Sequence, residues 1–365
     1  VEEIGQYGGT WKRCWTGVAD VSGPVRITYD PTLRWSEDGK RIEPNVAKGW
    51  NLSEDCKELI LYFREGMRWS DGKPLTADDV LFWFEDVVLN EDLTPVAPIW
   101  LTAGGSAKME KLDDYTIKLT FSNPNPLILQ WFVGVETFLP KHYLKDFHPK
   151  YVVKENLEAL TEEEGFEFWY QLFHAKNDWI SNPERPTHKA WKPINLPSSS
   201  LWTMERNAYY WKVDIAGNQL PYIDHITHTL ASDADMVTMK AVMGEIDMQF
   251  RHILISNYPL LMENRDKGDY RVIVWDTGDG SNCQLMFNQN YHEDEDMGEL
   301  IRNKDFRIAL SLAINRDEIN QLCYFGLGEP RQATVIPSCP TFEEEFAKVY
   351  IEHDPEKANE ILDGL

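Results

Sequence analysis

Alternating apolar and polar positions predict β-strands in the first half of the chain. Residues 25–29 alternate and stop at Asp30 and Pro31, which predicts a strand that runs into a loop. Residues 59–63 form a dense apolar run, and residues 115–121 place an apolar side chain at every second position. Turn residues close each run, as is typical of strands that bury one face.

A helical spacing of apolar side chains follows the second of these strands. Thr76 and Asp79 form a capping-box pattern, with Asp in place of the more common Glu. Behind it, one predicted helix face consists of Val80, Trp83, Phe84, Val87 and Val88. Trp83 is therefore expected in the core rather than in a ligand site.

Further helices and strands are predicted along the rest of the chain. A short apolar helix is expected at residues 127–133, and one acidic and then aromatic helix over residues 157–174, capped by Thr161 and Glu164. A proline-dotted connector at 182–197 precedes predicted strands at 201–206, 224–230, 246–248, 270–275 and 284–288. Helices are expected from Ser232 to Gly244, around residues 306–314, after Asn315 with Glu318, and from Asp354 with Pro355. Because helices and strands do not alternate strictly, the pattern predicts an α+β or multi-lobed α/β protein.

The charge balance narrows the range of partners. The chain carries 36 Lys and Arg against 60 Asp and Glu, a net charge of −24 over 365 residues. A surface this acidic repels phosphate backbones and anionic lipids, so nucleic acid is not an expected partner. The chain also has 14 Trp. Because an indole needs both a packing surface and an acceptor for its N–H group, these residues belong either to aromatic-rich cores or to a ligand groove.

No motif for catalysis, for a cofactor or for a metal is found. The chain lacks a P-loop, a nucleophile elbow, the His-Glu-x-x-His zinc motif and a dinucleotide-binding glycine pattern. His225 and His228 are three residues apart on a predicted strand and therefore face opposite sides. Paired acids such as Asp78 and Asp79 are interpreted as a solvated face rather than as a glycosidase pair. We therefore predict no catalytic residue, no metal and no cofactor, and a site built from shape, stacking and hydrogen bonds.

Cysteine usage and apolar runs bear on the compartment. The cysteines, Cys14, Cys56, Cys283, Cys323 and Cys339, are scattered and form no Cys-x-x-Cys pair. Five buried thiols are the favoured interpretation, and two disulfides with one free thiol are the alternative. No apolar run approaches the roughly 18–20 residues of a membrane span. The chain begins at Val1 without a basic and apolar leader, which is compatible with an export signal that has been removed.

Several segments, in their order and spacing, resemble one protein family. They are residues 7–10, 43–50, 63–80, 206–211, 218–224, 244–247 and 305–317. Together they resemble the family 5 extracellular solute-binding proteins of bacterial ABC importers, which include oligopeptide-, dipeptide- and oligosaccharide-binding proteins. The segment 63–80 is similar to the most recognisable signature of this family. Its residues form a turn and the start of a helix, so they are interpreted as structural and need not contact the ligand.

The resemblance implies a fold of the periplasmic-binding-protein type, α/β or mixed α+β in class, with two lobes and an extra inserted subdomain. Residues 1–45 and 184–277 would form the first lobe, residues 46–183 the inserted subdomain, and residues 278–365 the beginning of the second lobe. The segment from Asp354 resembles a helix after which family members continue, so the second lobe is expected to be incomplete in this sequence. Such a chain is expected to bind ligand weakly or not at all.

Candidate ligand contacts come from aromatic residues and from the segment between the lobes. Tyr29 lies at the end of a predicted strand, where α/β folds collect ligands. Trp35, Trp191 and Trp202 lack a core explanation, and Trp191 follows a turn that faces the cleft in relatives. Asp279, Ser281 and Asn282 belong to a Gly- and Asp-rich loop, 276–282, where the lobes should join. This loop is interpreted either as a hinge that contacts the ligand or as a plain surface turn, and the sequence does not decide between the two.

The resemblance also implies the ligand, the partners and the location. The ligand would be an extracytoplasmic oligosaccharide or oligopeptide, captured between the lobes and delivered to ABC permease subunits at the membrane; the indole count mildly favours a sugar. The protein would be a periplasmic or extracellular monomer, and tethering as a lipoprotein is an open alternative. A carbohydrate-active hydrolase and a ligand-sensing receptor on the same fold are the alternative functions.

Overall fold

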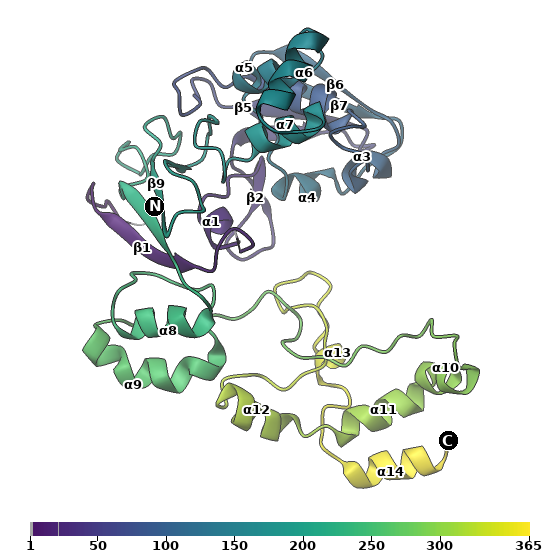
Figure 1. Cartoon of the computed structure of the whole chain (residues 1–365). Helices are drawn as coiled ribbons and strands as arrows, with labels where there is room; N and C mark the ends of the chain where they lie inside the picture. The colour runs from purple at the N-terminus through teal and green to yellow at the C-terminus, as the bar shows by residue number, and fades with distance from the viewer. Residues whose placement is uncertain (1–2, 21) are drawn as a thin grey trace. The chain divides into compact units, whose positions relative to one another are not determined.

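The computed structural model describes residues 3–20 and 22–365, and these divide into two compact units. The first unit contains the described residues up to Ser36, Arg41–Ile253 and Asp266–Tyr270. The second contains Glu37–Lys40, Leu254–Arg265 and Arg271–Leu365. Figure 1 shows both units along the chain, and each is described here by itself.

One mixed sheet of the first unit joins strands that are far apart in the sequence. It consists of β1 (Thr10–Trp15), β8 (Trp191–Pro193), β9 (Leu201–Arg206) and β10 (His225–Leu230), in the order β1-β10-β9-β8. β1 runs parallel to β10, and the other pairs are antiparallel. Its inward face packs Trp15, Trp202, Met204 and Ile226 into one core cluster. The predicted strands at 201–206 and 224–230 are confirmed.

A second sheet of this unit is wholly antiparallel. It contains β4 (Ala47–Leu52), β5 (Glu58–Phe63), β6 (Ala107–Asp113) and β7 (Thr116–Phe121), in the order β4-β5-β7-β6. The alternation in β5 and β7 buries one face of each strand, with Leu61 opposite Ile117. β2 (Leu33–Trp35) and β3 (Ile42–Pro44) form a separate hairpin. The predicted strands at 59–63 and 115–121 are therefore confirmed.

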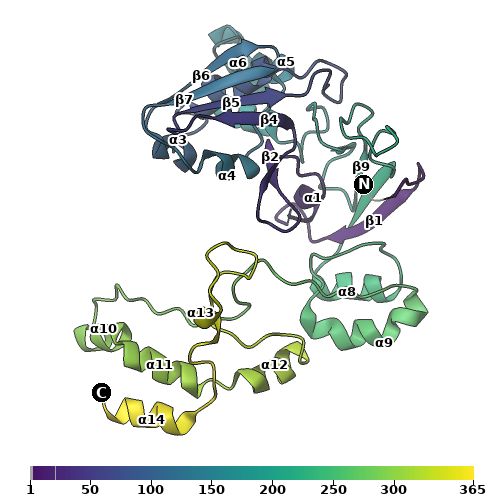
Figure 2. The same ribbon diagram turned by 180° about the vertical axis from the view of Figure 1, so that it is seen from behind.

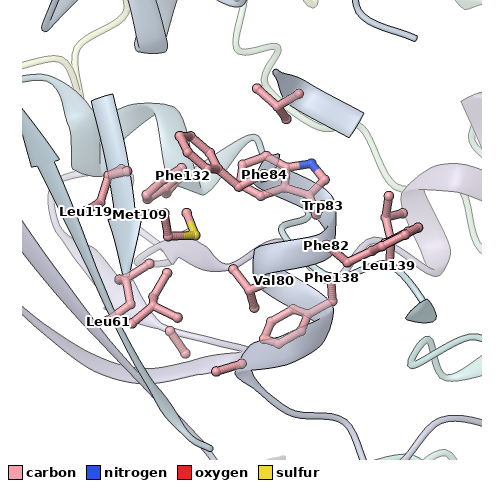
Figure 3. Packing of buried hydrophobic residues seen from close by; sticks show 14 of the residues in the cluster. Leu61, Val80, Phe82, Trp83, Phe84, Met109, Leu119, Phe132, Phe138 and Leu139 are labelled. Atoms are coloured by element: carbon pink, nitrogen blue, oxygen red, sulfur yellow. The ribbon is translucent and has the colours of Figure 1, made fainter. Parts of the chain in front are cut away.

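The helix after β5 begins as predicted and then changes its winding. α2 (Ala77–Leu81) is capped by Thr76 and Asp79 in a full capping box. It continues as a π-helix, η1 (Phe82–Val88), which spreads the buried residues over a wider face than an α-helical stripe. Figure 3 shows Val80 and Phe84 among the side chains of the sheet, and Trp83 is a core residue as predicted.

Shorter helices complete this part of the unit. They are α3 (Ile99–Ala103), α4 (Ile128–Val133), α5 (Lys141–Leu144), η2 (Lys145–Phe147), α6 (Lys154–Glu163) and α7 (Trp169–Asn177). Figures 1 and 2 show α5, α6 and α7 over one face of the antiparallel sheet. The single helix predicted over 157–174 is wrong, because the chain turns at Gly165, whose φ is +83°. Thr161 lies inside α6, where its hydroxyl donates to the Leu157 carbonyl, and caps nothing.

Two further predictions near the first sheet are wrong. Residues 25–29 belong mostly to a helix, α1 (Ser22–Ile27), rather than to a strand. Val25 and Ile27 pack against the core of the first sheet, which a single helical turn achieves as well as an alternating strand. The helix α8 (Ala234–Val242) is capped by Asp233, which accepts from the Met236 amide at 2.8 Å, and not by Ser232.

The second unit is built from helices. It contains η3 (Ile255–Asn257), α10 (Glu295–Arg302), α11 (Lys304–Ala313), α12 (Arg316–Tyr324), α13 (Glu344–Lys348) and α14 (Pro355–Asp363), while α9 (Tyr258–Gly268) begins in it. Ala309 and Leu312 of α11 pack against Ala358 of α14. Asn315 caps α12 and Asp354 caps α14, as predicted.

The strands predicted at 246–248, 270–275 and 284–288 are not formed in the described structure. Backbone groups of a strand need a neighbouring strand as partner, so alternation alone does not make one. The burial of all five cysteines is also wrong: Cys14 is buried, but Cys283 and Cys323 are exposed. The division into 1–45 with 184–277, 46–183 and 278–365 stays a prediction.

Candidate functional site

Four polar side chains meet just beyond the carboxyl end of β1. The Arg251 Nε donates to Asp20 Oδ1 at 2.8 Å, and the His252 imidazole shares a short hydrogen bond with Asp20 Oδ2. The Thr16 hydroxyl donates to the same oxygen at 3.3 Å. The Asp20 side chain is only 8% exposed, whereas that of Arg251 is 45% exposed. A fixed carboxylate therefore holds an accessible guanidinium in place.

The surrounding hydrogen bonds keep the Asp20 carboxylate charged. Burial of Asp20 raises its pKa, but hydrogen bonds from His252 and Arg251 outweigh burial and hold the pKa below the usual 3.8. The backbone of His252 has a φ of +64°, in the left-handed region that non-glycine residues seldom adopt. Such conformations concentrate at functional sites, where the surrounding structure maintains them.

The place of this cluster, just beyond the carboxyl ends of two parallel strands, makes it a candidate ligand site. β1 and β10 run parallel and end together at Trp15 and Leu230. In open α/β sheets, ligands bind in the crevice outside the carboxyl ends of the strands. Asp20, Arg251 and His252 were not predicted from the sequence. A signal for Asp20 existed, because it follows the first strand by five residues, but Arg251 and His252 reach it from a distant segment.

Two of the predicted ligand residues line a hollow at the other end of the same sheet, where its parallel strands begin. The hollow has a volume of about 610 Å³, and Tyr29, Trp191, Tyr210 and Lys212 are among its lining residues. It lies where the strands begin, since Ile223 precedes β10. Inside it, Asp30 accepts hydrogen bonds from the Tyr210 hydroxyl at 2.8 Å and from Lys212 Nζ at 2.5 Å. These polar groups are thus engaged with one another.

The four aromatic residues predicted to contact ligand differ in their solvent exposure. Tyr29 is 43% exposed, and its hydroxyl donates to the Val133 carbonyl at 3.4 Å. Trp191 is 8% exposed and its indole N–H donates to the Ile223 carbonyl at 3.1 Å. Trp35 is 44% exposed on β2. Trp202 is fully buried and stacked on Trp15, with ring centroids 5.0 Å apart.

The three loop residues belong to the second unit. Asp279 and Asn282 are exposed and Ser281 is half-buried, with its hydroxyl donating to the Cys283 carbonyl at 2.7 Å. The structure therefore brings Tyr29 and Trp191 into one hollow, and it places Trp35, Trp202 and these loop residues elsewhere. A ligand role for each of the seven stays a prediction.

An ion pair with one buried partner, Lys189, lies near Tyr29. Lys189, 3% exposed, forms a short ion pair with Glu136. Burial raises the pKa of Glu136, but Lys189, His188 and Arg185 together hold it below its ordinary value. Burial lowers the pKa of His188, which is 3% exposed. This arrangement is structural, because the charged groups satisfy one another.

Two general features complete the description. Within residues 3–20 and 22–365, no group of three or more His, Cys, Asp or Glu side chains is placed to hold a metal ion. In the same residues, no helix combines the length and the apolar character that crossing a membrane requires.

One mixed sheet, one antiparallel sheet and the helices that pack on them define an α/β protein, with a polar cluster at one end of the mixed sheet and a hollow at the other. The chain belongs to the bacterial extracellular solute-binding proteins, family 5: the family model described as "Bacterial extracellular solute-binding proteins, family 5 Middle" matches residues 41–364. The resemblance seen in the sequence is confirmed by this match.

Individual relatives agree on the fold and differ in ligand. The chain is 30% identical over 347 residues to the periplasmic alpha-galactoside-binding protein of Rhizobium meliloti, covering 92% of this chain and 47% of the relative. A solved oligopeptide-binding protein OppA is 43% identical with a TM-score of 0.86, covering 100% of this chain and 58% of the other. The stachyose complex of MelB from Agrobacterium fabrum C58 is 26% identical, with a TM-score of 0.68 and coverage of 99% and 56%.

The expected mixed α/β fold of the periplasmic-binding-protein type is confirmed by these structures. The chain spans about half the length of the curated relatives that it matches.

Proposed function

We propose that this chain is the ligand-capturing part of an ABC importer's substrate-binding protein. It binds an oligosaccharide or an oligopeptide outside the cytoplasm and presents it to permease subunits in the membrane. Membership of family 5 supports this function, and so do relatives whose names give an alpha-galactoside, stachyose or an oligopeptide as ligand. The name of the first relative also places that protein in the periplasm.

The observation that carries the proposal is the cluster of Thr16, Asp20, Arg251 and His252 at the carboxyl edge of the first sheet. Both oxygens of Asp20 are occupied by protein donors, so the carboxylate acts as a holder. What remains accessible is the guanidinium of Arg251, a planar set of N–H donors. Donors fixed in advance suit the hydroxyl oxygens of a sugar or the carbonyl oxygens of a peptide.

The same geometry favours binding over catalysis. A glycosidase needs two carboxyl groups that face one bond, one of them free to donate a proton. Asp20 is held ionised by its partners. We therefore propose that the ligand leaves unchanged, and that a hydrolase on this fold is the less favoured alternative.

Native mass spectrometry of the full-length protein, purified from its own host, tests the function directly. A co-purified ligand appears as a mass increment, and its mass separates a sugar from a peptide. Incubation with alpha-galactosides then shows whether the sugar is recovered intact. Release of monosaccharides would replace the proposal with the hydrolase. Co-purification with a sensor protein instead of a permease would favour the receptor.

A pair of variants tests the site. Arg251→Ala removes the accessible donors, and a hydrogen bond to a charged group contributes about 1.5–3 kcal/mol, so affinity for the identified ligand is expected to fall roughly 10- to 100-fold. Tyr29→Ala alters the hollow at the opposite edge and serves as the matched control. The reverse result, with Tyr29→Ala weakening binding and Arg251→Ala leaving it unchanged, would move the ligand site to the hollow.

A further inference from the structure

The inward face of the first sheet contains a group of buried polar atoms without hydrogen-bond partners. In the described part of the chain, six buried side-chain nitrogens lack a partner. Four of them belong to three residues, namely Arg13 Nε, Trp15 Nε1 and both ring nitrogens of His228. Buried polar groups are nearly always paired, so such a concentration on one face needs a physical reason.

The pairing of the strands brings these residues together. Arg13 of β1 lies directly opposite His228 of β10 in the parallel register, and Trp15 follows two residues later on the same face. Trp202 of β9 is the antiparallel partner of His228. The ring centroids of Trp202 and His228 are 5.2 Å apart, and those of Trp15 and His228 are 6.3 Å apart. The sheet therefore fixes all three unpaired side chains within one small region.

Arg13 carries a charge that no acidic group balances. Its side chain is 1% exposed, and no Asp or Glu among the described residues forms an ion pair with it. Its contacts are one long hydrogen bond, from a terminal guanidinium N–H to the Gly23 carbonyl at 3.4 Å, and the ring faces of Trp11 and Phe250 at 5.0 and 5.1 Å. Burial lowers the pKa of Arg13 to about 10, so the guanidinium still holds its proton at neutral pH.

The neighbouring groups add donors to this charge. Burial and the nearby Arg13 lower the pKa of His228 to about 3, which leaves a neutral ring with one N–H donor. Trp15 supplies an indole N–H, which can only donate. The three residues together offer three unpaired N–H donors, one of them on the charged guanidinium of Arg13, and a single acceptor, the second ring nitrogen of His228. Donors and a positive charge match an anion better than a water molecule or a metal cation.

We propose that Arg13, Trp15 and His228 form a buried site for a small monovalent anion of the size of chloride. The three side chains are each at most 1% exposed, so a sugar, a peptide or a carboxylate-bearing ligand cannot reach them. The site lies on the core face of the sheet and is distinct from the Asp20 cluster, and it does not depend on which solute the protein carries. The bound anion balances the charge of Arg13 and accepts hydrogen bonds from the unpaired side-chain N–H groups.

Thermal unfolding of the full-length protein at constant ionic strength tests the site. Sodium chloride and sodium bromide are compared with sodium gluconate, whose anion is too large for a closed core. A specific anion raises the melting temperature along a saturating curve, as linkage to a folded-state ligand requires. Chloride and bromide are expected to give such curves, and gluconate a flat one.

Two variants and one control separate a site from general salt effects. Trp15→Phe keeps an aromatic ring but removes one donor, and it is expected to lower the apparent chloride affinity at least about 10-fold. Arg13→Met removes the charge and is expected to abolish the chloride dependence. Arg26→Met removes an exposed arginine of α1 and should leave the dependence unchanged.

A crystal soaked in bromide gives the structural readout. We expect an anomalous peak between the side chains of Arg13, Trp15 and His228. Identical melting curves in chloride and gluconate, or a bromide-soaked crystal with only water at this position, would overturn the proposal. If Arg13→Met fails to fold, Trp15→Phe and the anomalous map still decide the question.

Discussion

Asp79 offers a sharp test of how the start of α2 is stabilised. Its side chain is buried and accepts three hydrogen bonds, from the Thr76 amide at 3.0 Å, the Trp69 indole at 3.2 Å and the Lys141 amide at 3.1 Å. Only the first belongs to the capping box that the sequence predicts. Asp79→Ala removes all three acceptor contacts at once.

The expected loss follows from these contacts. A cap contributes about 1 kcal/mol, and a buried donor left without a partner costs about 1–3 kcal/mol. Trp69 is fully buried, so its N–H cannot turn to water. Removing a buried carboxylate returns part of this loss, because burial already raises the pKa of Asp79 and disfavours its charge. We expect Asp79→Ala to lower the free energy of unfolding by about 3–4 kcal/mol.

Urea unfolding followed by far-UV circular dichroism measures this change. Thr76→Ala removes the cap but leaves Trp69 and Lys141 paired, and should cost about 1 kcal/mol. Asp78→Ala is the matched control one residue away, where the exposed carboxylate pairs with Lys111 and the expected loss is below about 1 kcal/mol. If Asp79→Ala costs no more than Thr76→Ala, the contacts with Trp69 and Lys141 contribute nothing, and the reasoning fails.

Three further outcomes are expected from buried groups. Burial lowers the pKa of His148 below 6.5, so below that pH the unfolded chain binds a proton that the folded chain does not, and stability falls as the pH drops. Between about pH 7 and pH 5, the urea midpoint should therefore fall less in His148→Gln than in the unmodified protein. An equal fall in both would contradict this reasoning. Lys189→Met removes the ion-pair partner of Glu136, whose side chain is 28% exposed, and should cost about 1.5–3 kcal/mol for the lost charged hydrogen bond, with partial recovery in Lys189→Met/Glu136→Gln; a double-mutant cycle with no coupling would refute it. Leu312→Ala empties the contact between α11 and α14 and should cost about 2–5 kcal/mol in denaturant unfolding, whereas a loss below about 0.5 kcal/mol would show that this contact is not a core.

Elements with strong local signals were predicted well. The capping box before α2, the caps of α12 and α14 and the alternation of β5 all depend on residues within a few positions of one another. Local sequence determines such features because the interacting groups are neighbours in every conformation of the chain. The predicted strand at 25–29 failed for the complementary reason: Val25 and Ile27 need only reach a core, and packing decided that a helical turn does so.

The candidate site was only partly predictable. Tyr29 and Trp191 were chosen from the sequence and do line one hollow, although Trp202 was chosen on the same grounds and lies in the core. Asp20 meets Arg251 and His252 across more than two hundred residues, so no local pattern could have paired them.

By itself, the sequence indicated the family, through motifs whose order and spacing resemble it, and it determined the mixed α/β class and the positions of well-capped helices, because those depend on local patterns and short-range hydrogen bonds. Tertiary structure alone decided that Trp202 is buried while Trp35 is exposed, which strands find partners and which charges meet. The physical reason is the same in each case: burial and pairing depend on segments that only the folded chain brings together. The unbalanced Arg13 opposite His228 is the clearest example, since neither residue is unusual until the parallel register of β1 and β10 places both in one core.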